Sequence, residues 1–164
     1  MSIIAGDLKF YLTGGVANSD PNLSLGGTRS TTQVGTALHQ LFDTVSPEEA
    51  TAGDVEYRAI DIVNTNVIDT LESAFLYISL ETGSTSSTVA LGYDSVGTQS
   101  AANESTAPTD VTFSTPTSKA TGIALGNIAA NGGSKRFWLR RTITAGAAKH
   151  AADAGQLSIT GGTA

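Results

Sequence analysis

The feature that most constrains the fold is a two-residue alternation of apolar and polar side chains, which recurs along the chain in short segments. In residues 71–82 (LESAFLYISLET), the apolar residues Ala74, Leu76, Ile78 and Leu80 occupy every second position. Successive side chains of a β-strand point to opposite faces, so this spacing lets one face of a strand enter a core. The segment is therefore predicted to be a strand.

The same reasoning predicts a series of short strands separated by turns rich in Gly, Pro, Asn and Ser. The other predicted strands cover residues 8–12, 56–64, 87–94, 111–113, 121–129, 135–144 and 156–160. No long helix is predicted between them, so a parallel βαβ sheet is not expected. We expect an all-β, single-domain β-sandwich of jelly-roll or Greek-key type over residues 1–164, with an Ig-like sandwich as the alternative.

One short helix is expected among these strands. Ser46 and Glu49 match the capping-box pattern, and Pro47 suits the first helical position. Gly53 is expected to end the helix after little more than one turn. The predicted helix therefore lies near residues 47–52.

Two long loops are also expected. Residues 95–110 are polar and rich in turn formers, which is typical of a surface loop. Residues 14–36 carry paired glycines and an Asn/Asp/Pro/Ser run, and they are predicted to form an extended arm. Leu38, Leu41 and Phe42 form an apolar cluster after this arm.

Composition excludes several classes of function. The chain has no cysteine, so disulfides, thiolate catalysis and Cys-type zinc or iron–sulfur sites are excluded. The formal net charge is −6, and a basic face of the kind that contacts phosphates is not expected, so we expect no nucleic-acid partner. No run approaches the roughly 18 apolar residues of a membrane span, so no membrane association is expected. The N-terminus lacks a secretory signal pattern, which predicts synthesis in a cytoplasm.

The acidic and amide residues of the 14–36 segment were tested as a metal loop. Asn18, Asp20 and Asn22 lie two positions apart, as at the start of an EF-hand loop. The pattern then fails, because Leu23 replaces the glycine of the sixth position and Arg29 replaces the glutamate of the twelfth. Asx turns that accept nearby backbone N–H groups explain these residues, with a calcium site of another type as the open alternative. We expect no metal and no cofactor.

Catalytic patterns are missing from the sequence. The two histidines, His39 and His150, belong to no HExxH or paired motif, and there is no GxSxG, SxxK or P-loop pattern. The neighbouring acids Glu48 and Glu49 are explained by the start of the predicted helix. We therefore expect that the chain is not an enzyme, and a small enzyme stays only as a hypothesis that a deep pocket with converging acidic groups or a histidine would revive.

The most basic segment is the predicted strand 135–144. Lys135-Arg136 and Arg140-Arg141 flank the apolar run Phe137 to Leu139. One interpretation is a docking strand that uses Trp138 as an anchor beside Arg140. The other is an ordinary strand whose solvent face carries an arginine stacked over Trp138. The sequence leaves both open.

Three blocks together resemble a known family. They are LKFYLTGGVANSDPNLSLGG (8–27), LFDTVSPEEATAGDVEYRAIDIVNTN (41–66) and GNIAANGGSKRFWLRRTITAGA (126–147). This arrangement resembles small structural proteins encoded among the virion genes of tailed bacteriophages, which are similar to capsid cement or decoration proteins. Proteins of that kind sit on the outer face of the major capsid shell, and jelly-roll and Ig-like sandwiches occur among them.

The resemblance implies a binding role without catalytic residues. The implied partners are the major capsid protein and further copies of the chain, as a homo-dimer or homo-trimer, and the implied location is the outer capsid surface of a virion. The candidate contact residues are Asn18, Asp20, Leu23, Leu25, Trp138 and Arg140. The alternatives are a carbohydrate-binding or host-attachment module and a tail or neck component of the virion.

Overall fold

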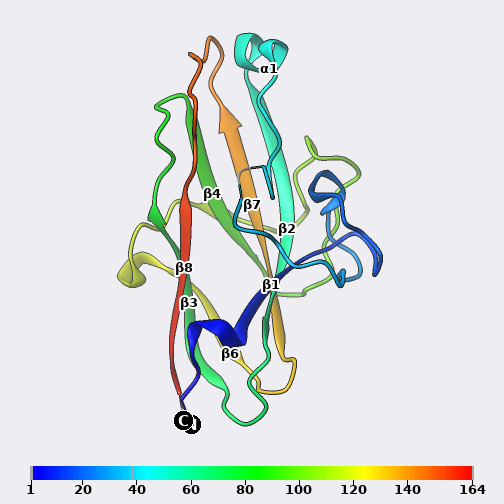
Figure 1. The fold of residues 1–164 in the computed structure, drawn as a ribbon, viewed down its shortest axis with the longest axis vertical. Coiled ribbons are helices and arrows are strands. Elements are labelled where there is room, and N and C mark those ends of the chain that lie inside the picture. The colour runs from blue at the N-terminus through cyan, green and yellow to red at the C-terminus, as the bar shows by residue number, and fades with distance from the viewer. Residues whose placement is uncertain (1, 38, 164) are drawn as a thin grey trace.

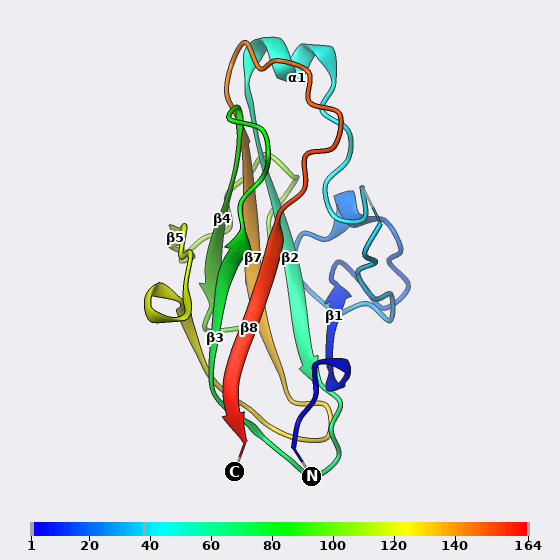
Figure 2. The same cartoon turned by 60° about the vertical axis from the view of Figure 1, so that its left-hand side comes forward.

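The computed structural model describes residues 2–37 and 39–163, and over these residues eight strands form two antiparallel sheets (Figures 1 and 2). The first sheet contains, in spatial order, β1 (Leu8–Leu12), β2 (Asp54–Asn64), β7 (Ser134–Ile143), β4 (Ser87–Asp94) and β5 (Phe113–Ser114). The second contains β6 (Ile123–Ile128), β3 (Leu71–Leu80) and β8 (Gln156–Thr163). The prediction of an all-β sandwich is confirmed.

The predicted helix is present as α1 (Pro47–Ala52). Ser46 Oγ accepts the backbone N–H of Glu49 at 3.2 Å, and Glu49 Oε2 accepts that of Ser46 at 2.7 Å, which completes the capping box. Gly53 ends the helix with a φ of 82°. Three short 3-10 turns also occur, η1 (Ala5–Asp7), η2 (Pro21–Leu23) and η3 (Lys119–Thr121).

The sandwich is elongated, with α1 at one end and both chain termini at the other (Figures 1 and 2). We call these the helix end and the terminal end. The long ladder between β2 and β7 runs along this axis, from the pair Asp54–Ile143 to the pair Val63–Ser134. Strand β7 lies between β2 and β4, which are distant from it in the sequence. This order could not be read from local patterning.

The core lies between the two sheets. The first sheet contributes Ile60 and Ile62 of β2 and Phe137 and Leu139 of β7 to the buried apolar cluster. The second sheet contributes further members to the same cluster, namely Leu71, Ala74, Leu76, Ile78, Leu125 and Ile128. Leu41 and Phe42 of the predicted apolar cluster pack against this core, and Leu38 lies outside the described residues.

The loop that follows β4 crosses the outer face of the first sheet. Glu104 reaches β2 beyond the part that pairs with β1, where its carbonyl accepts the backbone N–H of Tyr57 at 2.7 Å. The chain then returns to β5, and the ring of Phe113 contacts that of Tyr57, with 5.5 Å between centroids. Gly92 makes room for this loop, because a Cβ there would lie 2.4 Å from Val111 Cγ1 and 3.1 Å from the carbonyl oxygen of Thr112.

Replacing Gly92 tests this close approach. We expect Gly92→Ala to lower the free energy of unfolding by about 1–3 kcal/mol, because the added methyl group overlaps the loop. The matched control is Gly162→Ala, at a strand glycine whose nearest atom would be 4.0 Å away. Urea denaturation of both variants measures the effect, and equal midpoints for Gly92→Ala and the unmodified protein would contradict it.

Candidate functional site

The predicted arm at residues 14–36 folds back onto the first sheet. Ser30 donates its backbone N–H to the carbonyl of Leu12 at 2.8 Å, and Leu12 donates to Thr32 at 3.0 Å. Val34 donates to Phe10 at 2.8 Å. Residues 30–34 therefore run along β1 and cover the outer edge of the first sheet. The arm is an ordered, irregular loop whose backbone makes these hydrogen bonds within the protomer.

A buried pair of hydroxyls fixes the arm to β2. The backbone N–H of Thr13 donates to Ser24 Oγ at 2.8 Å, and Ser24 Oγ donates to the carbonyl of Ala59 at 2.6 Å. Ala59 in turn donates its N–H to the carbonyl of Ser24 at 2.7 Å. Thr13 and Ser24 are fully buried. The arm thus extends the pairing of β2 beyond the end of β1.

The candidate residues Asn18 and Asp20 form the expected Asx turns. Asn18 Oδ1 accepts the N–H of Asp20 at 2.9 Å, and Asp20 Oδ1 accepts that of Asn22 at 2.9 Å. Asn18 also donates its amide to the carbonyl of Thr13 at 2.6 Å. These contacts shape the loop. In the part of the chain that the structure describes, no group of three or more His, Cys, Asp or Glu side chains is placed to hold a metal ion.

The two leucines of the arm differ in exposure. Leu23 is 57% exposed, whereas Leu25 is half-buried. Leu23 is therefore available for contact with another molecule, together with the nearby Val16, which is 60% exposed. Leu25 offers less surface.

Trp138 and Arg140 do not form an exposed docking face. Trp138 is fully buried on β7 between its strand partners Ala59 and Gly92, beneath the loop that follows β4. The expectation of Trp138 as a surface anchor is therefore wrong, because the 95–112 segment covers it. Arg140 is half-buried and stacks on Phe113, 5.4 Å from the ring centroid, so the expected stacking of an arginine over Trp138 is also not found.

A cluster of buried charges on the core-facing side of β2 was not predicted. Arg58 is fully buried, and its Nη2 donates to Glu56 Oε1 at 3.1 Å, Glu104 Oε2 at 2.8 Å and Asn22 Oδ1 at 2.7 Å. Its Nε donates to the carbonyl of Leu41 at 3.2 Å. One guanidinium therefore binds three separate loops to β2. We call Glu56, Arg58 and Arg141 the β2 charge cluster.

Arg141 of β7 completes the β2 charge cluster. Its Nε donates to Glu56 Oε2 at 2.5 Å, and its Nη1 donates to the carbonyl of Asp43 at 2.8 Å. The ring of Phe42 lies over both guanidinium groups, 5.3 Å from that of Arg58 and 4.9 Å from that of Arg141. Burial raises the pKa of Glu56, and the charges of Arg141 and Arg58 act in the opposite direction. The β2 charge cluster anchors loops, and the carboxylate of Glu56 is bound by the guanidinium groups of Arg58 and Arg141.

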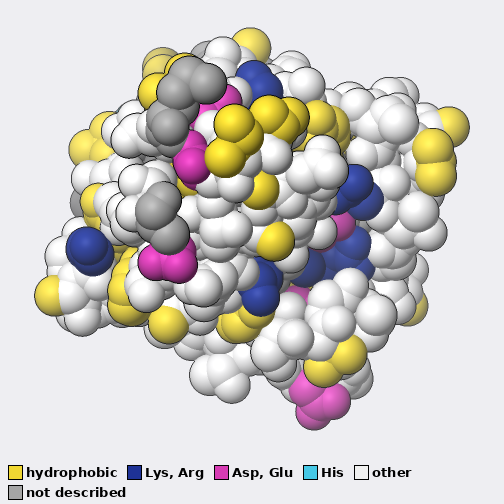
Figure 3. Space-filling view, turned by 90° about the horizontal axis from the view of Figure 1, so that it is seen from below, with side chains coloured by type: hydrophobic (Ala, Val, Ile, Leu, Met, Phe, Trp, Pro, Cys, Tyr) yellow, Lys and Arg dark blue, Asp and Glu magenta, His cyan; other side chains and the backbone are white. Residues whose placement is uncertain are grey.

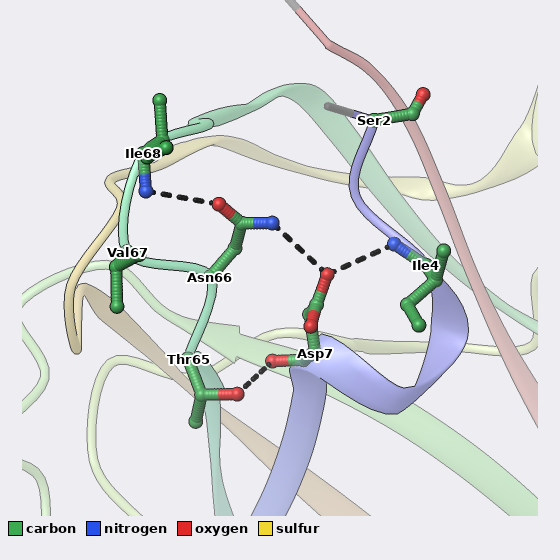
Figure 4. Close-up of a pocket in the computed structure, with 7 residues that line it drawn as sticks. All are labelled: Ser2, Ile4, Asp7, Thr65, Asn66, Val67 and Ile68. Carbon is green, nitrogen blue, oxygen red and sulfur yellow. Dashed lines mark hydrogen bonds between the residues drawn. The ribbon is translucent and has the colours of Figure 1, made fainter.

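Exposed apolar side chains gather at the terminal end. Ile4, Val67 and Ile68 are 65%, 74% and 66% exposed and line an open hollow of about 570 Å³ (Figure 4). We call these three residues the terminal patch. Figure 3 looks onto this end and shows several small groups of hydrophobic side chains among polar ones. Because removing exposed aliphatic side chains from water is favourable, such a grouping favours contact with another apolar surface.

A hydrogen-bonded frame holds the terminal patch in place (Figure 4). Asp7 Oδ2 accepts the backbone N–H of Ile4 at 3.0 Å and the side-chain amide of Asn66 at 3.1 Å. Asn66 Oδ1 accepts the backbone N–H of Ile68 at 2.9 Å. The donation from Ile4, and then that from Asn66, lowers the pKa of Asp7. Asp7 is the one titratable side chain among the described residues that line this hollow, so the hollow suits binding better than proton transfer.

Aromatic side chains offer no platform on the surface. All five Phe, four Tyr and one Trp are buried or half-buried. A sugar-binding face usually needs exposed rings, so this distribution does not favour the carbohydrate-binding interpretation.

Ser24→Ala tests whether the arm is part of the sandwich. We expect it to lower the free energy of unfolding by about 1–3 kcal/mol, since it leaves the buried N–H of Thr13 without its acceptor and removes one of the two hydroxyl donors to the carbonyl of Ala59. Ser19→Ala, at an exposed position of the same arm, is the control and should leave stability unchanged. The account of the arm fails if thermal unfolding gives the same Tm for both variants.

Glu56→Gln tests the β2 charge cluster. The substitution keeps the shape of the side chain and removes the charge shared by Arg58 and Arg141, so we expect a loss of about 3 kcal/mol in the free energy of unfolding. Glu81→Gln, at an exposed loop position, serves as the control. Chemical denaturation at neutral pH measures both, and a loss below about 0.5 kcal/mol for Glu56→Gln would show that the cluster is dispensable.

None of the helices in residues 2–37 and 39–163 has the length and apolar character needed to cross a bilayer. No family model, no curated protein and no solved structure matches the chain.

Proposed function

We propose that this chain is a structural protein of a tailed-bacteriophage virion that binds the outer face of the major capsid protein shell and stabilises it as a cement or decoration protein. The resemblance of the blocks at 8–27, 41–66 and 126–147 supports this assignment. The terminal patch carries it structurally, since it gives a rigid sandwich an apolar surface for contact. The mechanism is adhesion, with no catalytic step.

The mechanical properties of the sandwich fit such a role. The arm is fixed by Ser24, and the loops beside it are fixed by Arg58, so the protomer can bind as one body with little ordering cost. Burial of an aliphatic side chain contributes about 1.5–3 kcal/mol, so the terminal patch alone supplies modest affinity. Repetition over a capsid lattice, in homo-oligomers, would turn modest contacts into strong retention.

Other virion roles are distinguished by position and copy number. A tail or neck component would use the same kind of contact surface at a few sites on each particle. A carbohydrate-binding or host-attachment module is less well supported, because every aromatic side chain is buried or half-buried.

Quantitative mass spectrometry of purified virions tests the proposal. We expect a copy number of the same order as that of the major capsid protein, since a decoration protein follows the lattice. A few copies per particle would point instead to the tail or neck. Absence from the particle would overturn the assignment to the virion.

A binding experiment with shells that lack this protein tests the role of the terminal patch. We expect the double variant Val67→Asn/Ile68→Asn to bind about 10- to 100-fold more weakly, since two exposed aliphatic contacts are lost. The matched control is Val96→Asn. Val96 is 66% exposed, lies in the turn after β4 and does not line the hollow of the terminal patch, so this variant should bind normally. Equal binding by both variants would exclude the terminal patch as the contact.

A further inference from the structure

One long strand edge in the described chain has no partner. Strand β8 pairs with β3 along one side, and within residues 2–37 and 39–163 no strand pairs with its other side. By contrast, residues 30–34 cover the edge of β1. In Figure 2, β8 runs along the front of the sandwich towards the terminal end. An unpaired edge of eight residues presents a row of backbone groups that another strand can bind.

The direction of those backbone groups follows from the ladder with β3. Ile78 donates its N–H to the carbonyl of Pro116 at 2.8 Å, in the connection that leads towards β6 and so away from β8. In an antiparallel ladder, the backbone groups of two directly opposite residues that do not bond each other point outward. Leu157, the partner of Ile78, therefore directs its N–H and C=O to the free edge, and Ile159, the partner of Leu76, follows at two-residue spacing. Gly161 lies two residues further along β8, beside the irregular part of the ladder.

The edge also lacks the features that usually prevent strand pairing. Proteins protect such edges with charged residues, prolines or bulges. Strand β8 reads QLSITGGT, and Asp153 is the last charged residue of the chain. The register irregularities between β3 and β8 leave β8 itself continuous in its alternation from Leu157 to Thr160. Two copies of this strand can therefore meet without opposing like charges.

We propose that β8 pairs antiparallel with β8 of a second copy of this chain, so that the two three-stranded sheets become one six-stranded sheet. The two-fold axis passes between the two Ile159 residues. In this register, the outward-directed groups of Leu157, Ile159 and Gly161 in one copy face those of Gly161, Ile159 and Leu157 in the other. All of them are satisfied by the pairing.

The side chains on the core-facing side fit this register. Leu157 of each copy comes opposite Gly161 of the other, where a Cβ would lie 2.8 Å from Leu71 Cδ1, so an apolar side chain of the protomer backs this position. A groove of about 280 Å³ lies at this place. Ile3, Ile4 and Leu8 line it on one side, and Leu71, Ile159 and Gly161 on the other. Leu157 of the second copy can therefore enter an apolar groove that the protomer leaves open.

The opposite side of the strand is also complementary. Ser158 of one copy comes opposite Thr160 of the other, in pairs that do not exchange backbone hydrogen bonds and so bring side chains closest. Thr160 Oγ1 is buried within the protomer, where it has no hydrogen-bond partner among the described residues. Hydroxyl pairs of this type stabilise neighbouring strands. Neither face of β8 therefore places a charge against a second copy, and the apolar groove beside Ile159 offers a place for its Leu157.

This pairing narrows the homo-oligomer of the proposed function to a two-fold dimer. The β8 pairing rests on the proposed function only for the expectation of a homo-oligomer. The pairing itself is a property of the isolated protein. Failure of the dimer would leave capsid binding through the terminal patch open, and failure of capsid binding would leave the dimer open. A single strand pair with one groove is a small interface, so we expect a dissociation constant on the order of 10 µM.

Sedimentation equilibrium of the full chain and of two charged variants tests the interface. Ser158→Asp/Thr160→Asp and Ser158→Lys/Thr160→Lys each place like charges opposite one another in the proposed register. We expect the unmodified protein to dimerise, each variant alone to be monomeric, and an equimolar mixture of the two to dimerise again. Thr88→Asp, at an exposed position of β4, is the control and should dimerise normally.

Each other result overturns the proposal. A monomer at concentrations up to about 1 mM would show that the edge stays unpaired. A trimer, or a dimer that survives both sets of charges, would place the interface elsewhere. Recovery of the dimer in the mixture requires both variants to be folded, so a mixture that stays monomeric while circular dichroism shows both folded contradicts the register.

Discussion

The ion pairs around Arg58 are the interaction on which this side of the molecule depends. Moving a guanidinium out of water costs several kcal/mol unless charged or polar acceptors surround it. Here the acceptors come from the arm (Asn22), from the loop before α1 (Leu41), from β2 itself (Glu56) and from the loop after β4 (Glu104). Burial of Arg58 therefore requires these segments to close around β2. These loops are held in place because they supply the acceptors that the buried guanidinium of Arg58 requires.

The closure of these loops around Arg58 determines which surfaces of the protomer remain uncovered. The arm covers the edge of β1, and the loop after β4 covers Trp138 and the outer face of β7. The terminal patch and the edge of β8 lie away from these loops, and they keep exposed apolar groups and unpaired backbone groups. One side of the protein is covered by loops, and the terminal end exposes apolar side chains. Such a protein is suited to repeated contact with an ordered shell. This is the physical basis for the proposed role on a capsid.

Local sequence patterns predicted the strands but not their arrangement. The alternation in 71–82 and in 87–94 depends only on neighbouring residues, so β3 and β4 were found close to their true bounds. The insertion of β7 between β2 and β4 depends on contacts between distant segments, which no local pattern encodes. The burial of Trp138 has the same origin, since it needs Gly92 on the next strand and a loop that crosses above it.

The phase of the charged residues along two strands is the sequence signal of the β2 charge cluster. Glu56 and Arg58 are in phase with Ile60 and Ile62, and Arg141 is in phase with Phe137 and Leu139. Charged residues on a core-facing row must find partners on the same side, so their positions indicate a buried ion pair between two neighbouring strands. The pairing could not be assigned without the register that places Glu56 opposite Arg141.

The most direct measurement of the proposed role is an image reconstruction of intact virions by electron cryomicroscopy. We expect elongated density that fits the sandwich at lattice-related positions on the outer face of the shell, with the terminal end towards the major capsid protein. Density of this shape confined to the tail or neck, or a shell whose outer face carries no copy of the sandwich, would contradict the account.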